Sequence, residues 1–276
     1  MRASARPTYL DEEKDKEHMS PLAIFLALVA LFAVLAAVFY KLRKVHIAAL
    51  ETREIVSDIR TELAALFPQE RWQELLIHQL NFSKPLPPTR GWAGSPDFLL
   101  QVAQYVAANK PRVVVECSSG VSTLVIARTM QQSGVGHVYC LEHDEAYAER
   151  TRQMLREYGV EDRATVFYAP LIERPNYSRW YDDGLLPIDL PPVELLVVDG
   201  PPMATGPLAR YPALPLLLQR LAHVVTIFVD DADRDDEREM LRRWQREVQG
   251  LQVEFRFCEK GLAIVSGTRE TGLVPS

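Results

Sequence analysis

The 276-residue chain has few cysteines and no long run of basic residues. Its three cysteines, Cys117, Cys140 and Cys258, stand singly in apolar runs rather than in a paired CxxC spacing. Neither a zinc site nor a disulfide framework is therefore expected. The formal net charge is -6, whereas a protein that holds nucleic-acid phosphates needs clustered Lys and Arg. The sequence predicts buried, reduced thiols and no nucleic-acid partner.

A charge-free apolar run covers residues 21–40 and is long enough for a helix to cross a membrane. A cleaved signal peptide is the alternative, but acidic residues crowd the preceding segment and no small-residue cleavage site follows the run. Lys41, Arg43 and Lys44 lie directly behind it, which places the C-terminal side in the cytoplasm. We therefore expect a tail over residues 1–20, one transmembrane helix and a cytoplasmic remainder.

Apolar residues recur at helical spacing over residues 41–67, which predicts an amphipathic juxtamembrane helix. This helix could join two copies of the chain as a short coiled coil, but packing on its own domain is at least as well supported. The prolines and glycines of SKPLPPTRGWAGSPDF mark an irregular connector, which we place over residues 68–95. The folded domain then covers residues 96–276.

Within this domain, short β-branched runs alternate with helical patterns. The alternation predicts a Rossmann-like α/β fold, in which a mostly parallel sheet carries helices on both faces. The two closing strands are too close for a helix to join them, so one must run antiparallel. The expected helices are 97–108, 122–132, 145–158, 208–222 and 233–248, and the expected strands are 112–117, 137–142, 164–168, 193–198 and 224–229, followed by two strands around 259–261.

The first strand ends in a turn of small residues, in VVVECSSGVSTLVIA. Ser118, Ser119 and Gly120 allow the backbone to turn tightly and approach a ligand, at the edge where open parallel sheets bind ligands. The turn lacks the GxGxxG of nicotinamide-binding proteins. Glu116 beside it would repel a pyrophosphate and attract a ligand that carries an ammonium group and a sulfonium.

The second strand ends in Glu142, followed by His143 and Asp144. An acid at this place can accept hydrogen bonds from both hydroxyls of a ribose. The alternative is a solvated or helix-capping acid. Together with the Glu116 turn, the pattern favours ribose binding.

Three carboxylates follow the later strands, with Asp199 after VELLVV and both Asp230 and Asp231 after TIFV. Carboxylates that meet at one sheet edge repel one another unless a cation compensates them, and hard oxygen ligands suit Mg²⁺, Ca²⁺ or Mn²⁺. The alternative needs no metal. Asp230 and Asp231 would then be a helix cap and a solvated neighbour, and Asp199 would orient the substrate or accept a proton.

A long segment, residues 170–192, separates two expected strands and contains Trp180 and Tyr181. Loops of this length are often lids or binding loops. Arg210 and Tyr211 belong to another rim of the same cleft and are candidates for contact with the substrate. The alternative is a loop-to-helix junction packed by its own aromatic residue.

The ordered motifs GWAGSPDF, VVVECSSGVSTLVIA, YCLEHDEAYAERT, LLVVDGPP, TGPLARYPALPLL and FVDDADRDDERE resemble a known family. The similarity is to bacterial class I S-adenosylmethionine-dependent methyltransferases classed as methyltransferase family 24, over about residues 90–266. It implies a seven-stranded sheet whose last strand is antiparallel, with Glu116 near the methionine amino group and Glu142 on the ribose. The cofactor site implied by the matching motifs also includes Ser118, Ser119, Gly120, Ser122 and His143.

Related sugar O-methyltransferases and catechol-type enzymes hold Mg²⁺ on carboxylates that match Asp199, Asp230 and Asp231. Two positions depart from the usual patterns. Ser118 stands where the cofactor turn normally has its first Gly, and Asp231 stands where catechol-type enzymes carry Asn.

The resemblance and the anchor together predict a membrane-bound enzyme that transfers a methyl group from S-adenosylmethionine to a hydroxyl. The acceptor would be a small molecule, a glycan or a lipid-linked precursor, and Asp199 is the nearest candidate for the base. Two alternatives stay open at this point. One is a nicotinamide-dependent oxidoreductase, and the other is a membrane-tethered scaffold with an inactive methyltransferase fold, for which Ser118 is the feature in favour.

Overall fold

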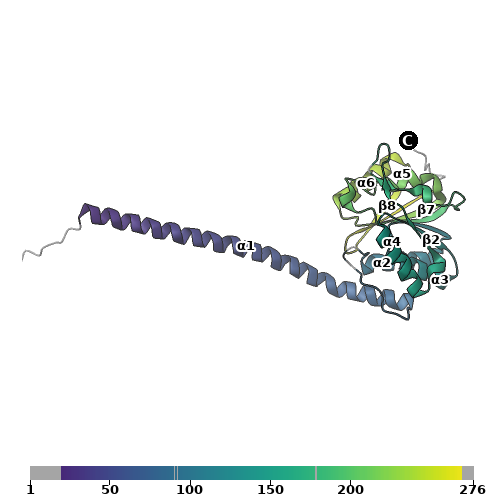
Figure 1. Ribbon diagram of the computed structural model, residues 1–276, viewed down its shortest axis with the longest axis horizontal. Coiled ribbons are helices and arrows are strands. Elements are labelled where there is room, and N and C mark those ends of the chain that lie inside the picture. The colour runs from purple at the N-terminus through teal and green to yellow at the C-terminus, as the bar shows by residue number, and fades with distance from the viewer. Residues whose placement is uncertain (1–19, 90, 92, 178, 269–276) are drawn as a thin grey trace, which may run out of the picture. The chain divides into compact units, whose positions relative to one another are not determined.

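The chain divides into two compact units, residues 1–63 and residues 64–276. A long helix, α1 (Pro21–Leu80), contributes residues to both (Figure 1). The tail expected over residues 1–20 lies outside the described residues, apart from Ser20. The computed structural model describes residues 20–89, 91, 93–177 and 179–268, with side chains described everywhere in these ranges except residues 61–67.

In the first unit, α1 begins behind Ser20, whose hydroxyl accepts a hydrogen bond from the Ala23 amide at 3.2 Å. Over Pro21–Arg60 the helix is long and apolar enough to cross a membrane. Its large apolar side chains are exposed, with Phe32 at 74%. A signal sequence near the N-terminus shares these properties.

In the second unit, α1 continues to Leu80, so residues 68–80 are helical where the sequence pattern predicted a connector. Pro68 lies inside this helix and removes one backbone hydrogen bond. Leu76 and Leu80 are fully buried in the core of the unit, and that burial outweighs the lost bond. The irregular stretch is therefore shorter than predicted and begins after the helix ends.

The second unit is built on a seven-stranded sheet in the order β3-β2-β1-β6-β7-β9-β8. All neighbours pair in parallel except β9, which is antiparallel to β7 and to β8. The predicted fold class and the antiparallel last strand are thus confirmed. The strands are β1 (Val113–Cys117), β2 (His137–Glu142), β3 (Ala164–Tyr168), β6 (Val193–Val198), β7 (Leu221–Asp230), β8 (Gln252–Arg256) and β9 (Leu262–Thr268).

Helices cover both faces of this sheet (Figure 1). Successive residues of a strand point to opposite faces, so Val113 and Val115 enter one apolar core and Val114 enters the other. The core around Val114 is closed by α2 (Pro96–Asn109), α3 (Val121–Ser133) and α4 (Glu145–Tyr158). The opposite core is closed by α5 (Ala213–Leu217) and α6 (Asp235–Glu247).

The helix expected over residues 208–222 is wrong in length. Only Ala213–Leu217 forms an α-helix, followed by a 3-10 turn at Leu218–Arg220 and by the early start of β7 at Leu221. Leu208 has a positive φ of 50°, which is incompatible with a regular helix at that position. Pairing of Leu221 with Val193 then extends the strand at the expense of the helix.

The segment expected as a structureless loop, residues 170–192, contains a small antiparallel hairpin. Its strands are β4 (Leu171–Ile172) and β5 (Trp180–Tyr181). Trp180 and Tyr181 are both fully buried, so they belong to the core rather than to an exposed lid. The hairpin therefore brings these two aromatic residues to the carboxyl edge of the sheet as fixed parts.

Candidate cofactor and acceptor site

The turn between β1 and α3 has an unusual backbone. Ser118 adopts a φ of 130° and Gly120 a φ of 147°, in a region that side chains make costly and that glycine tolerates. The Ser118 amide donates to the carbonyl of Leu141 in the neighbouring strand at 3.0 Å, which fixes the turn. Ser118 thus occupies a position whose backbone favours glycine.

Glu116, at the end of β1, is fully buried and directed into the protein. Its Oε2 accepts hydrogen bonds from Thr123 Oγ1 at 2.6 Å and from Cys140 Sγ at 3.2 Å. Burial raises the pKa of Glu116, and hydrogen bonds from Ser122, Thr123 and Cys140 oppose that shift. Glu116 and Ser122 therefore interact with each other behind the turn.

Glu142, at the end of β2, is held by its neighbours on both oxygens. Ser119 Oγ donates to Oε2 at 3.0 Å, and the Asp144 amide donates to Oε1 at 3.0 Å. His143 Nδ1 also lies 3.0 Å from Oε1. The helix-capping role considered for Glu142 falls instead to Asp144, which accepts from the Tyr147 amide at 2.8 Å. The Glu142 carboxylate is fixed by this arrangement.

A cavity of about 300 Å³ opens at this edge. It brings together four of the predicted cofactor residues, Ser118, Ser119, Glu142 and His143, while Glu116, Gly120 and Ser122 are not in its lining. Of the remaining lining residues, Tyr147, Gly200 and Pro202 were not singled out from the sequence. Tyr147 could have been found from its place in the first turn of α4, directly after the end of β2. The remaining lining residues are Asp144, Tyr147, Tyr181, Asp199, Gly200 and Pro202.

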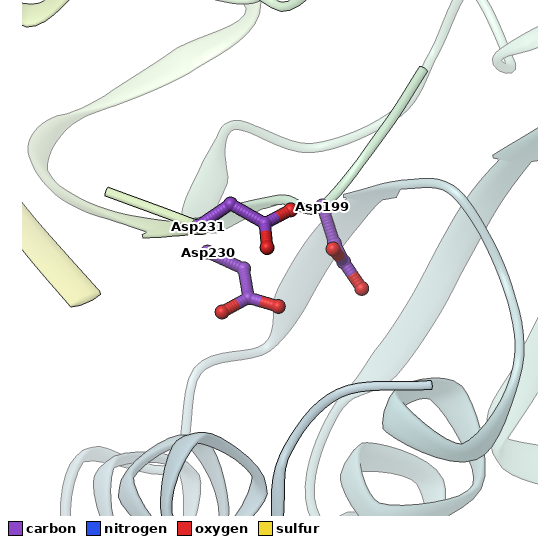
Figure 2. A group of neighbouring side chains, drawn as sticks. All are labelled: Asp199, Asp230 and Asp231. Carbon is purple, nitrogen blue, oxygen red and sulfur yellow. The ribbon is translucent and has the colours of Figure 1, made fainter. Parts of the chain in front are cut away.

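The three predicted metal ligands do meet. Asp199 follows β6, Asp230 ends β7 and Asp231 follows it, and Figure 2 shows their carboxylates gathered at one place. One oxygen from each lies within 4.8 Å of the others. Neither oxygen of Asp230, nor Oδ1 of Asp231, has a hydrogen-bond partner among the described residues. Such a set of oxygen donors fits a hard divalent cation.

Arg210, predicted at a rim of the cleft, lies inside this cluster and also lines the second cavity described below. Only 4% of its side chain is exposed, and Nη2 is 2.7 Å from Asp231 Oδ2 and 3.6 Å from Asp199 Oδ1. Its guanidinium also donates to the backbone carbonyls of Asp199 and Asp230 at 2.7 and 2.9 Å. Arg210 is thus a buried counter-ion that shapes the strand ends. Arg234 also contacts Asp231 Oδ2, at 2.7 Å.

The guanidinium does not neutralise the whole cluster. Burial raises the pKa of Asp230 well above its usual value, and the carboxylates of Asp199 and Asp231 raise it further. Burial likewise raises the pKa of Asp199 to about 6, although Arg210 opposes the shift. The cluster therefore favours a bound proton or a bound cation over three bare carboxylates.

A second cavity, of about 200 Å³, adjoins the first. Asp199 and Pro202 line both cavities, so the two cavities share these residues. Lys260 lines the second cavity and donates to the carbonyls of Gly91 and Ala93 at 2.8 and 3.1 Å. The other lining residues are Gly91, Met203, Ala204, Arg210, Asp231 and Arg234.

Tyr211 is in the lining of neither cavity. Its hydroxyl donates to the Glu247 carboxylate at the end of α6, and its backbone carbonyl accepts from the Trp244 indole at 2.9 Å. The structure therefore corresponds to the alternative considered for this residue, a junction packed by its own aromatic side chain.

Comparison with known proteins shows which protein family this domain resembles. Residues 115–232 match the family model described as a methyltransferase domain, Methyltransf_24. The matched segment spans the strands that carry Glu142, Asp199 and Asp230. A comparison with curated proteins found no match.

Solved structures with the same fold include several methyltransferases. The N-terminal domain of human METTL16, in complex with SAH, has 14% identity and a TM-score of 0.51, covering 72% of this chain and 80% of that one. A methyltransferase from Geobacter sulfurreducens has 16% identity and a TM-score of 0.48, covering 76% and 97%. The O-methyltransferase TomG from Streptomyces achromogenes, in complex with SAM, has 16% identity and a TM-score of 0.49, covering 72% and 98%.

Together, the family match over residues 115–232 and the fold identify a class I, S-adenosylmethionine-dependent methyltransferase domain. The prediction made from the motifs is confirmed at this level.

Proposed function

We propose that the protein is a membrane-anchored O-methyltransferase, which moves the methyl group of S-adenosylmethionine to a hydroxyl of a small-molecule, glycan or lipid-linked acceptor. The observation that carries the proposal is the place of Asp199, in the lining of both cavities. A donor in the first cavity and an acceptor in the second would meet beside a carboxylate, as methyl transfer requires.

The first cavity suits the cofactor. Both oxygens of Glu142 are already oriented by Ser119 and the Asp144 amide, and each has a further lone pair for a ribose hydroxyl. Tyr147 offers an aromatic surface in the same lining. The first cavity would bind and orient the cofactor, and Glu142 would not have to change its conformation.

In the reaction, the acceptor oxygen forms a bond to the methyl carbon while the carbon–sulfur bond breaks. The bonding pair goes to sulfur and leaves S-adenosylhomocysteine, and the hydroxyl proton goes to Asp199. Above a pH of about 6 the Asp199 carboxylate is ionised and able to accept that proton. Most of the acceleration comes from holding donor and acceptor in line.

We further propose that Asp199, Asp230 and Asp231 hold Mg²⁺. The unpartnered oxygens of Asp230 and Asp231 favour this, although Arg210 holds the second oxygen of Asp231. When bound, the ion would lower the pKa of the acceptor hydroxyl.

The helix Pro21–Arg60 supports an anchor by its length and composition. Lys41, Arg43 and Lys44 behind the apolar run favour a cytoplasmic catalytic domain, where glycans and lipid-linked precursors at the membrane would be within reach. Membrane extraction of the full chain with carbonate, followed by protease treatment of intact spheroplasts, tests both parts. Retention in the membrane with protection of the domain is the expected result.

The central experiment is calorimetric titration of the full chain in detergent with S-adenosylmethionine, S-adenosylhomocysteine and NAD⁺, with and without Mg²⁺. We expect both sulfur ligands to bind and NAD⁺ not to bind. In Glu142→Ala the affinity for both should fall by roughly 100-fold, because two charge-assisted hydrogen bonds are lost.

Glu149→Ala is the matched control, since Glu149 is an exposed acid of α4 that pairs with Arg152 and Arg156. It should bind both ligands as the wild type does. Folded wild-type protein that binds neither sulfur ligand would contradict the proposal and favour the inactive scaffold. Binding of NAD⁺ in the same cavity would favour an oxidoreductase.

A further inference from the structure

The second cavity has a lining of three different kinds. Residues 202–204 form an apolar side, in which Met203 is 57% exposed. Asp199 belongs to the lining shared with the first cavity. Arg234 and Lys260 add two cationic side chains, which take no part in the proposed transfer step. These two cations therefore need a role of their own.

Backbone contacts hold the two cations at the same cavity. The Asp233 amide donates to the Lys260 carbonyl at 3.2 Å, and the Ala232 amide donates to the Gly261 carbonyl at 3.1 Å. The turn after β7 is thereby joined to the turn between β8 and β9. Gly261 permits this approach, because a Cβ atom built on it would lie 2.6 Å from the Asp233 nitrogen. Arg234 directly follows the joined segment, so main-chain contacts fix its position relative to Lys260.

Both cations keep donors for a ligand. Lys260 Nζ donates to the carbonyls of Gly91 and Ala93 at 2.8 and 3.1 Å, which leaves one of its three donors. Arg234 pairs with the acids of the protein through Nη1, which is 2.7 Å from Asp231 Oδ2. Its side chain is 41% exposed, so the rest of the guanidinium stays within reach of a ligand.

The acids around these cations are more deeply covered. The side chain of Asp231 is 4% exposed and that of Asp199 is 14% exposed. Arg210 already lies 2.7 Å from Asp231 Oδ2 and 3.6 Å from Glu237 Oε1, and the Glu237 side chain is 5% exposed. The accessible charge of this cavity is therefore mainly cationic, which attracts an anionic group and disfavours a cationic one.

We propose that Arg234 and Lys260 form an anion subsite of the second cavity, which holds a phosphate or carboxylate group of the methyl acceptor. Both side chains can give charge-assisted hydrogen bonds to the oxygens of such a group. The inference rests on the proposed function, which puts the acceptor hydroxyl beside Asp199. Of the acceptors considered there, an acidic small molecule or a lipid-linked phosphate fits this subsite, and a neutral glycan does not.

The subsite acts on acceptor binding rather than on the transfer step. Substitution of Arg234 or Lys260 should raise KM for the acceptor far more than it lowers kcat, because the donor and the hydroxyl still meet beside Asp199. The apolar side at residues 202–204 would contact the hydrocarbon part of the same acceptor. A proton or Mg²⁺ on the buried aspartates would remove negative charge nearby and strengthen the attraction.

The anion subsite can be tested without knowledge of the acceptor. Inorganic phosphate is titrated into the full chain in an uncharged detergent, without divalent cations, and its phosphorus NMR line width is followed. Saturable broadening is the expected result for the wild type. Acetate is then added as a competitor. Displacement of phosphate by equimolar acetate would identify a carboxylate-type subsite, and retention of phosphate would identify a phosphate subsite.

Two variants connect this binding to the proposed residues. In Arg234→Gln and in Lys260→Gln the affinity for phosphate should fall by roughly tenfold, because a charge-assisted hydrogen bond is lost. Their affinity for S-adenosylmethionine should stay the same, since neither residue lines the first cavity. Thermal unfolding checks that both variants are folded.

Arg242→Gln is the matched control. Arg242 is an arginine of α6 with a side chain 62% exposed, it pairs with Glu239 at 3.3 Å, and it lines neither cavity. It should bind phosphate as the wild type does. Folded wild-type protein without saturable broadening would overturn the proposal, and so would equal affinities in all the variants. Failure to bind S-adenosylmethionine with phosphate binding intact would instead refute the proposed function and leave the anion subsite in place.

Discussion

Glu142 and Asp230 are both buried acids at the carboxyl ends of parallel strands, with 4% and 0% of their surfaces exposed. Their surroundings differ. Each oxygen of Glu142 accepts a hydrogen bond from a neighbour, whereas neither oxygen of Asp230 has a partner among the described residues. A buried carboxylate at the carboxyl end of a parallel strand is therefore fully hydrogen-bonded at β2 and without a partner at β7, three strands away.

The difference shows two ways in which a sheet edge can prepare a binding group. At Glu142 the protein orients the carboxylate in advance, so a ligand meets a fixed acceptor. At Asp230 the protein maintains an unfavourable charge that a proton or cation must relieve. Binding at the first place depends on geometry, and binding at the second depends on charge.

The largest expected effect concerns Asp199, which lies between these two groups. Asp199→Asn keeps the shape but removes the proton acceptor, so kcat should fall by roughly 10²- to 10⁴-fold while the affinity for S-adenosylmethionine changes little. Without Mg²⁺, wild-type kcat should fall as pH is lowered through about 6, where Asp199 becomes protonated, and bound Mg²⁺ should move this fall to lower pH. Assay of methyl transfer to an identified acceptor checks both. A variant with wild-type kcat would remove Asp199 from the mechanism.

The next effect is a loss of stability at Glu142. In Glu142→Gln the amide group must face either Ser119 Oγ or the Asp144 amide, both of which donate at present. The ligand-free protein should lose about 1–3 kcal/mol of unfolding free energy. Denaturant unfolding of the full chain measures this. Unaltered stability would mean that the carboxylate is not fixed as described.

The same chemical change at Asp230 should have the opposite sign. Without divalent cations at pH 7, Asp230→Asn should gain about 1–3 kcal/mol, because an uncompensated buried charge is removed. The pKa of Asp230 is raised in the folded state. Wild-type stability therefore falls as pH rises from about 4 toward that raised pKa, and the advantage of the variant grows over the same range.

Addition of Mg²⁺ distinguishes Glu142 from Asp230 further. The ion should raise the melting temperature of the wild type and of Glu142→Gln, but not that of Asp230→Asn. Thermal unfolding of the three proteins over a series of Mg²⁺ concentrations measures these shifts. An equal shift in all three proteins would place the ion elsewhere.

The smallest expected effect is at Ser118. Its φ of 130° favours glycine, so Ser118→Gly should stabilise the protein by about 1 kcal/mol without weakening the binding of S-adenosylmethionine. Ser119→Gly is the comparison, since it removes a donor to Glu142 and should weaken binding. Weaker binding in Ser118→Gly would show that the Ser118 side chain itself contacts the ligand.

Most of the fold could be predicted from the sequence because its signals are local. Strand β2 and helix α4 match the predicted bounds, since the short apolar run of β2 and the Asp144 cap of α4 are local signals. The helix predicted over 208–222 failed because strand pairing of Leu221 with Val193 overrides its local pattern. The extension of α1 to Leu80 likewise depends on burial of Leu76 and Leu80, which distant residues provide.

The site could be predicted only as far as topology determines it. The three aspartates meet because parallel strands end at one edge, and Glu142 reaches the cavity for the same reason. The place of Arg210 among the aspartates, and that of Tyr181 in the cavity, depend on how the loops fold back over that edge. No spacing in the sequence encodes those contacts.

The position of β9 has a consequence for the order of assembly. This strand comes last in the chain, yet it is inserted between β7 and β8, with Leu262 paired to Asp230. During synthesis β7 keeps an open edge until β9 emerges, and β8 has no neighbour in the sheet. The strands that hold Glu142 can pair earlier, because β1, β2 and β3 are complete by Tyr168. A growing chain can therefore complete its cofactor edge before its acidic edge, and β7, which carries Asp230, gains its second neighbour only when β9 is made.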